Sequence, residues 1–217
     1  EMEGANIGPK VTQYTLKPPS GVKLNRISAL ETNIALNLAA QALRIEAPIP
    51  GQRAVGIEVP NRKAADVRLY GILTAKQWGS ATEPLSFAIG KDIAGDAVVG
   101  ELNKMPHLLI AGQTGSGKSV MINTLLSSLL YRNSPADMRL ILVDPKQVEM
   151  TPYQDIPHLL TPIITEPEKT ISALKWAVNE MERRYTLLAE VKVRDIKSYN
   201  SKKPEEPMPY IVIVIDE

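Results

Sequence analysis

The sequence contains no cysteine and only two histidines among its 217 residues. Without cysteine, the chain can form neither a disulfide framework nor a thiolate metal site. His107 and His158 both flank apolar segments, which favours structural roles for them over metal binding. No apolar run approaches the length of a transmembrane helix, and the N-terminal residues lack a signal-peptide pattern. With 44% hydrophobic residues, the composition predicts one large globular domain or two small ones.

The chain also has little net charge, +1 at neutral pH, but that charge is unevenly distributed. From Lys10 to Lys76 there are ten Lys and Arg residues against four acids. A basic region of this kind suits a nucleic-acid surface. An ordinary solvated face is the alternative, and the charge distribution alone favours this alternative.

The most informative segment is a glycine-rich loop that fits the pattern G-x-x-x-x-G-K-[ST] at every fixed position. A predicted strand at 107–111 precedes it, and a predicted helix at 120–132 follows. This context identifies a phosphate-binding P-loop rather than a chance Gly/Ser-rich turn. We expect the loop's backbone N–H groups to hold phosphate oxygens, Lys118 to reach the β- and γ-phosphates, and Ser119 to bind Mg²⁺. The predicted nucleotide-binding residues are Gly112, Gln113, Thr114, Gly115, Ser116, Gly117, Lys118 and Ser119.

A second candidate site element follows the apolar run 210–215, which predicts a strand buried on both faces of a parallel sheet. Two acids, Asp216 and Glu217, come directly after this run. Ligands bind beyond the carboxyl ends of strands in open α/β sheets. We expect Asp216 to hold Mg²⁺, in part through water, and Glu217 to act as general base on the attacking water. The structural alternative is a core strand that ends in a solvated acidic turn.

Two domains are predicted, a small α+β domain over residues 1–80 and a P-loop ATPase domain over 81–217. The first contains expected strands at 11–16, 44–46 and 54–59 and helices at 30–43 and 67–77. A capping box, Ser28 with Glu31, marks the start of the first helix. The second domain opens with an expected hairpin whose turn is 94–96.

After the P-loop helix, the alternation of strand and helix predicts a parallel α/β sheet. A strand at 139–143 ends in Asp144-Pro145-Lys146. The longest helix is expected to start at a second capping box, Thr165 with Glu168. Its apolar side chains recur every three or four positions and are interpreted as core packing: Ile171, Leu174, Val178, Met181, Tyr185 and Leu188.

These residues resemble the FtsK/SpoIIIE family of DNA-translocating ATPases. The resemblance rests on ordered segments: GQTGSGKSVMINTLLSSLL, LILVDPKQVEM, YQDIPHLLTPIIT, ALKWAVNEMERRY, VRDIKSYN and PYIVIVIDE. The N-terminal GPKVTQYTLKPPSGVKLNRISAL and the later IEVPN are similar to that family's small α domain. The resemblance therefore covers essentially the whole chain.

The resemblance implies a RecA-like motor that uses ATP and Mg²⁺ and assembles as a ring, usually a hexamer, around double-stranded DNA. It also implies a cytoplasmic motor domain tethered to the bacterial inner membrane by segments absent from this chain. Asp144 and Lys146 match the family's Asp-Pro-Lys motif. We hypothesise that one of them couples the nucleotide state to a neighbouring subunit or to DNA, with a strand-end salt bridge and turn as the alternative. The segment Glu182-Arg183-Arg184-Tyr185 matches a further family signature. Glu182 and Arg183 are expected on the solvated side of their helix, where an ordinary surface face is favoured over an intersubunit contact.

The sequence departs from the family where it stops, at Glu217. The strand that follows Walker B in RecA-like sheets lies between the Walker A and Walker B strands, so its absence predicts an unpaired gap. The missing part also includes the arginine that acts in trans. We therefore expect these residues to be the front part of a longer chain, and to bind nucleotide weakly on their own.

Two other functions fit the same residues. One is a related ATPase of conjugative DNA transfer or protein secretion. The other is a catalytically incomplete nucleotide-binding fragment. The N-terminal small domain and the Asp-Pro-Lys segment favour a chromosome translocase, which would grip DNA phosphates rather than read bases.

Overall fold

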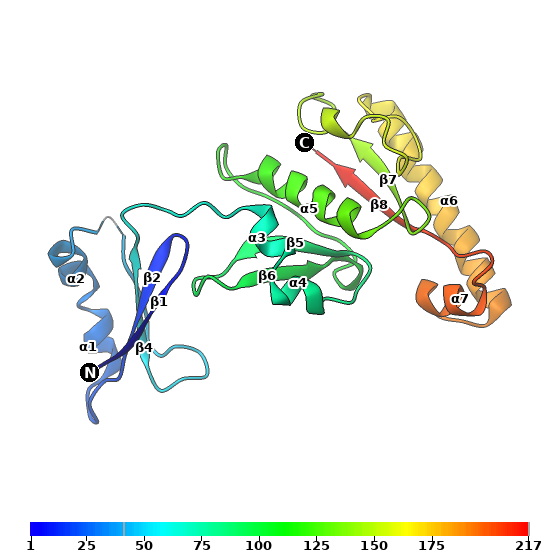
Figure 1. Cartoon of the computed structure of the whole chain (residues 1–217). Coiled ribbons are helices and arrows are strands. Elements are labelled where there is room, and N and C mark those ends of the chain that lie inside the picture. Colours follow the sequence, from blue (N-terminus) through cyan, green and yellow to red (C-terminus); the bar gives the residue numbers. More distant parts are fainter. Residues whose placement is uncertain (41, 217) are drawn as a thin grey trace. The chain divides into compact units, whose positions relative to one another are not determined.

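The computed structural model describes residues 1–40 and 42–216. The chain divides into two compact units, Glu1–Ala111 and Gly112–Glu217, and each is described separately (Figure 1). The boundary between the units falls immediately before the P-loop. The domain boundary near residue 80 remains a prediction.

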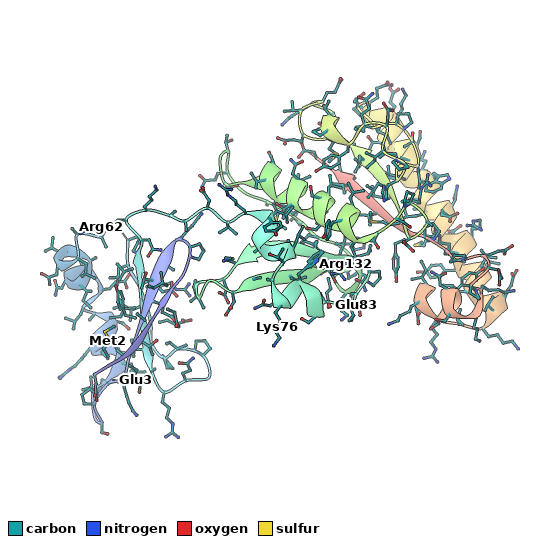
Figure 2. All side chains as sticks on the ribbon, viewed as in Figure 1. Met2, Glu3, Arg62, Lys76, Glu83 and Arg132 are labelled. Carbon is teal, nitrogen blue, oxygen red and sulfur yellow. The ribbon has the colours of Figure 1, made fainter. Side chains whose placement is uncertain are left out.

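The first unit begins with a four-stranded antiparallel sheet in the order β1-β2-β4-β3. Its strands are β1 Met2–Ile7, β2 Val11–Leu16, β3 Arg44–Glu46 and β4 Val55–Pro60. The three predicted strands are therefore confirmed. Asn61 closes the sheet's end, because its side chain accepts a hydrogen bond from Thr12 Oγ1 at 2.7 Å and donates one to the Gly8 carbonyl at 2.8 Å. Figure 2 marks Met2 and Glu3 on β1, where Glu3 pairs with Lys17 at 3.8 Å.

The helices of this unit are shorter than the sequence predicts. Helix α2 Glu31–Asn37 covers only part of the helix predicted at 30–43, of which residue 41 lies outside the described residues, and an unpredicted helix α1 Leu24–Ser28 precedes it. Helices α3 Leu69–Leu73 and α4 Lys76–Ser80 replace the single helix predicted at 67–77. The predicted capping box at Ser28 is wrong. Ser28 is the last residue of α1, so its hydroxyl faces the Leu24 carbonyl within that helix at 3.5 Å, and Leu30 is the residue at the N-cap of α2.

A hairpin of β5 Ser86–Lys91 and β6 Ala97–Glu101 forms the second part of the unit, followed by the short 3₁₀ turn η1 Leu102–Lys104. The predicted turn is confirmed: Asp92 Oδ1 accepts the backbone N–H groups of Ala94 and Asp96, both at 2.9 Å. Phe87 is 1% exposed, and its ring lies against Gly100, where a Cβ atom would collide with it. Glu83, marked in Figure 2, accepts from Asn103 Nδ2 at 2.7 Å and pairs with Lys104 at 3.2 Å.

The second unit packs a parallel strand pair between two helices (Figure 1). The strands are β7 Met138–Val143 and β8 Tyr210–Ile215; the helices are α5 Lys118–Arg132 and α6 Pro167–Val191, with the short η2 Thr151–Tyr153 and α7 Ile196–Lys202 in the connections. Along the other edge of β7 runs the segment 159–164, held by two parallel bridges. Strand β7 is therefore central and buried on both faces. Ile141 and Val143 pack with Ala173 of α6, and the alternate residues Leu140 and Leu142 are fully buried on the opposite face.

The predicted strand at 107–111 is absent. These residues form no ladder with any described strand, and Leu109 is 90% exposed. A strand forms only where a neighbouring strand supplies hydrogen-bond partners. Within the described residues β8 pairs with β7 alone, and no strand beside its other edge is available to link the segment 107–111 to the sheet. The segment's apolar character alone was therefore insufficient to make a strand.

The apolar stripe of α6 is not in the core, which contradicts the prediction. Ile171, Val178 and Tyr185 are each at least half exposed, and Leu174 and Met181 nearly so. The neighbouring row, with the small residue Ala173, faces β7 and β8 instead. Small side chains let the helix approach closely, and a two-stranded sheet is too narrow to cover both rows.

The second capping box is also wrong. The N-cap of α6 is Glu166, and neither Thr165 nor Glu168 caps the helix through its side chain. Pro167 occupies the first helical position, which suits its fixed φ and its missing N–H. Thr165 instead follows Ile164, the residue that bridges Val143 of β7.

Candidate functional site

The P-loop runs from Gly112 to Gly117 as an exposed turn that leads into α5. Gly115 and Gly117 adopt positive φ angles of 79° and 101°, a region that residues with a Cβ atom rarely occupy. At Gly112 a Cβ atom would collide with the Ser116 side chain. The backbone conformation therefore favours glycine at positions 115 and 117, and the Ser116 side chain leaves no room for a Cβ atom at Gly112.

Lys118 and Ser119 are the first two residues of α5, where backbone N–H groups have no partner within the helix. Both side chains are partly buried. The Ser119 hydroxyl donates a hydrogen bond to Glu149 Oε1 at 2.6 Å. This contact joins the P-loop helix to the loop that follows β7.

The carboxyl ends of β7 and β8 bring Asp144 and Asp216 to neighbouring positions, because Val143 and Ile215 are partners in the parallel register. Asp144 is 1% exposed and Asp216 is 8% exposed. The Asp216 N–H donates to the Val143 carbonyl at 2.9 Å and so extends the ladder by one residue. Glu217, the predicted general base, lies outside the described residues.

Asp144 holds the loop after β7 in place. Its Oδ2 accepts the backbone N–H groups of Glu149 at 3.0 Å and Met150 at 2.9 Å. Its other oxygen, Oδ1, is buried and has no hydrogen-bond partner. Such depth keeps the Asp144 carboxylate away from a neighbouring subunit or DNA, so the coupling hypothesis is carried forward for Lys146, which is exposed.

Sequence reasoning did not single out Glu149. It lies inside the segment LILVDPKQVEM, but it fits no nucleotide-site pattern and stands thirty positions from Ser119. Only the path of the loop after β7 brings the two side chains together.

The residues present fit a magnesium–nucleotide complex. The exposed backbone of the P-loop suits phosphate oxygens, and Lys118 and Ser119 stand at the start of α5 as such a site requires. At the carboxyl ends of β7 and β8, an unsatisfied Asp144 oxygen and the Asp216 carboxylate supply the hard oxygen donors that Mg²⁺ prefers.

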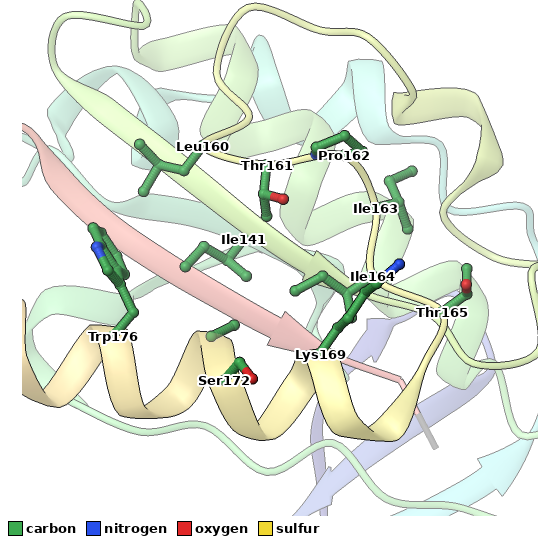
Figure 3. A pocket seen from close by; sticks show the side chains of 11 residues that line it. Ile141, Leu160, Thr161, Pro162, Ile163, Ile164, Thr165, Lys169, Ser172 and Trp176 are labelled. Carbon is green, nitrogen blue, oxygen red and sulfur yellow. The ribbon is translucent and has the colours of Figure 1, made fainter.

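A hollow of about 560 Å³ lies elsewhere in this unit, between α6 and the segment 160–165 (Figure 3). Trp176, Ile141 and Leu160 give it an apolar lining, and Lys169 stands at one side. None of the predicted nucleotide-binding residues lines it. The hollow is therefore separate from the P-loop site.

Two residues of the signature on α6, Arg183 and Arg184, form an ion-pair cluster with Glu180. Glu180 accepts hydrogen bonds from Arg183 Nε and Arg184 Nε, both at 2.7 Å. The Arg183 hydrogen bond, with a further contribution from Arg184, lowers the pKa of Glu180 to about 2. Arg184 also donates to the Pro209 carbonyl at 2.7 Å, just before β8. Glu182 and Arg183 are exposed, as predicted.

Within residues 1–40 and 42–216, no helix is both long and apolar enough to span a bilayer. The same residues contain no group of three or more His, Asp or Glu side chains placed to bind a metal ion on their own. His158 is buried, and its Nε2 lies 2.9 Å from the Asn133 carbonyl oxygen.

The chain's sequence matches two protein-family profiles. Residues 68–216 match the FtsK/SpoIIIE family, and residues 1–61 match the FtsK alpha domain. The chain belongs to the FtsK/SpoIIIE family. The resemblance seen in the sequence is thereby confirmed.

Curated relatives of this FtsK/SpoIIIE chain carry the name DNA translocase FtsK. The protein of Clostridium tetani is 59% identical over 97% of this chain and 29% of its own length. Those of Caldanaerobacter subterraneus and Campylobacter jejuni are 55% and 51% identical over 97% of this chain, covering 30% and 23% of their own lengths. The chain thus spans less than a third of these relatives.

Solved structures confirm the P-loop ATPase fold. The conjugation coupling protein TcpA of pCW3, solved as a monomer with ATPγS, has a TM-score of 0.55 and 25% identity, over 99% of this chain and 58% of its own. The cytoplasmic domain of the Type VII secretion ATPase EccC from Thermomonospora curvata has a TM-score of 0.57 and 26% identity, over 71% of this chain and 21% of its own. The predicted RecA-like α/β class with an added small α+β domain agrees with both neighbours.

Proposed function

We propose that this chain is part of an ATP-driven double-stranded DNA translocase that acts in chromosome segregation. The observation that carries the proposal is the 49–59% identity, over nearly the whole chain, to proteins named DNA translocase FtsK. Family membership and the P-loop geometry support the use of ATP and Mg²⁺. The proposal includes self-association into a ring, with six subunits expected, and a cytoplasmic position beside the inner membrane; both of these rest on the family resemblance.

The proposed site divides its work among residues of this chain. The P-loop backbone from Gly112 to Gly117 binds the phosphates, and Lys118 pairs with the terminal ones. Ser119 and Asp216 hold Mg²⁺, which neutralises charge on the phosphate oxygens when bound. Glu217 orients the attacking water and takes its proton. Burial of Asp144 and Asp216 keeps this edge of the sheet poor in water, which strengthens the electrostatic interactions there.

A second candidate function is an ATPase of conjugative DNA transfer or protein secretion. The similarity in fold to TcpA and EccC supports it. The sequence identity to those two proteins is about half that to the FtsK relatives, so the chromosome translocase is the better-supported proposal. A third candidate, for the 217 residues on their own, is a fragment that binds nucleotide but is catalytically incomplete.

The first experiment is ATP hydrolysis by the complete gene product, with and without long linear double-stranded DNA. Strong stimulation by DNA is expected, and Lys118→Ala should lower the stimulated rate by roughly 100-fold or more, because it removes a charge that stabilises the transition state. Lys175→Ala, an exposed lysine of α6, is the matched control. Hydrolysis that ignores DNA would favour a polypeptide substrate, and no hydrolysis under either condition would leave only nucleotide binding.

A further inference from the structure

One hydrogen bond of the P-loop helix is not used by the proposed nucleotide contacts. Ser119 Oγ donates to Glu149 Oε1 at 2.6 Å, a short distance typical of a hydroxyl bound to a carboxylate. Glu149 is half-buried and belongs to the loop between β7 and η2. The contact therefore reaches the hydroxyl that the proposed site assigns to Mg²⁺.

Asp144 fixes the main chain at Glu149. The backbone N–H groups of Glu149 and Met150 both bind Oδ2 of Asp144, and Asp144 itself is 1% exposed. Met150 is fully buried, which anchors the adjoining main chain in the core. The backbone that carries the Glu149 side chain is therefore held both by Asp144 and by the core.

A second set of hydrogen bonds joins η2, which follows this loop, to Ser119 of α5 through Asn123. The Tyr153 hydroxyl, 9% exposed as a residue, donates to Asn123 Oδ1 at 2.8 Å. Asn123 Nδ2 in turn donates to the Ser119 carbonyl at 3.0 Å. Two residues after β7 therefore hold Ser119. Glu149 binds the Ser119 side chain directly, and Tyr153 of η2 acts on the Ser119 carbonyl through Asn123.

A serine hydroxyl has one hydrogen and two lone pairs. When the hydrogen is given to Glu149, the lone pairs remain for a cation, and their direction is set by that hydrogen bond. Groups that bind the outer side of a metal ligand orient it and raise its basicity, and their loss typically costs 10–100-fold in metal affinity. The carboxylate also adds negative charge close to the cation.

We propose that Glu149 is a positioning residue for Mg²⁺: it holds the Ser119 oxygen toward the ion, and Asp144 holds Glu149. This inference rests on the proposed nucleotide site. It also gives the Asp-Pro-Lys segment a physical connection to the metal, because Asp144 is the first residue of that segment.

The test measures metal binding rather than turnover, in the complete gene product. Mn²⁺ binding in the presence of ADP is followed by electron paramagnetic resonance, and the affinity of a fluorescent ATP analogue is measured in Mg²⁺ and in EDTA. We expect Glu149→Ala to weaken Mn²⁺ binding by roughly 10–100-fold, with nucleotide affinity in EDTA unchanged. Glu149→Gln keeps an acceptor of the same shape without the charge, so it should lose less, and it provides the test if Glu149→Ala fails to fold.

Glu190→Ala, an exposed acid of α6, is the control and should bind Mn²⁺ as the wild type does. Unchanged Mn²⁺ affinity in both Glu149 variants would overturn the inference and make the contact merely structural. Tighter binding would also overturn it, since Glu149 would then compete with the cation for Ser119. A wild-type protein that binds no nucleotide in Mg²⁺ would overturn the proposed site itself, an outcome distinct from the other two.

Discussion

Asp144 is the least exposed of the described carboxylates, and it accepts two backbone N–H groups. We expect these two hydrogen bonds to stabilise the fold. Asp144→Ala leaves both donors without an acceptor inside the structure, so we expect a loss of about 2 kcal/mol or more in the free energy of unfolding. Asp144→Asn keeps an acceptor oxygen at the same place and should lose less than half as much. Denaturant unfolding of both variants, with an exposed control such as Asp155→Asn, measures this. Equal losses in the two Asp144 variants would contradict it.

For single residues, the sequence predicts those functional positions that a motif with fixed spacing specifies. The P-loop could be placed because its pattern fixes Gly112 and Gly117, and Gly117 has the positive φ that favours glycine. The positive φ of Gly115, a variable position of the pattern, is not encoded by that spacing. The role of Glu149 could not be predicted, because its partner Ser119 is thirty positions away and the distance between them depends on the loop after β7. The Asp-Pro-Lys motif indicates Asp144, but the motif does not encode the burial of this side chain, which depends on Met150 and other core residues.

At the scale of the elements, the cluster of Glu180, Arg183 and Arg184 connects α6 to the chain just before β8. We expect this cluster to make the free energy of unfolding depend on pH. The pKa of Glu180 is about 2 in the folded chain, below its ordinary value of 4.5. A lowered pKa stabilises the fold above pH 4.5, and this contribution is lost as pH falls from about 4.5 to about 2. Glu180→Gln should cost about 1–2 kcal/mol at pH 7, after allowance for the exposed Arg183, and nothing near pH 2.

Unfolding by urea at several pH values measures this difference. Glu182→Gln, on the exposed side of the same helix, is the matched control and should change little at any pH. If Glu180→Gln and the wild type differ by the same amount at pH 7 and pH 3, the pair does not titrate as the geometry implies.

The helices also indicate why element boundaries are harder to predict than elements. Apolar periodicity placed α6 correctly along the chain, but it does not say which row of the helix meets the sheet. Ala173 sits against Ile141 and Val143, while the larger Val178 and Tyr185 stay exposed, because close approach favours small residues. Both capping boxes failed for a related reason: the tertiary path, not the local pattern, decided where each helix began.

For the molecule as a whole, the proposed DNA partner implies a strong dependence on salt. A translocase that grips phosphates releases counterions when it binds, and six to ten contacts would lose roughly 10³–10⁵ in affinity between about 50 and 200 mM salt. We expect the complete gene product to bind two duplexes of unrelated sequence with the same salt slope. Fluorescence anisotropy at several KCl concentrations measures it. A flat slope, or a clear preference for one sequence, would contradict phosphate binding.

At the same scale, fold class was predictable and sheet content was not. The P-loop, β7 and β8 follow from patterns within each segment, and family membership agrees with them. The failure at 107–111 arose because a strand is defined by its neighbour, and no described strand pairs with that segment. The apolar pattern of a segment shows that it could form a strand, but whether the strand forms depends on the neighbouring strands of the sheet.

The pairing of β7 with β8 has a consequence for synthesis. Partners such as Met138 and Tyr210 lie roughly 70 residues apart, and the P-loop helix, α6 and α7 are all made before or between them. Contacts of such high sequence separation form late, because a long loop must close first. On the ribosome, β7 therefore emerges well before its partner, with one edge supported by the segment 159–164 and the other exposed. Because exposed strand edges favour aggregation, we expect nascent chains of this unit to aggregate most readily during that interval.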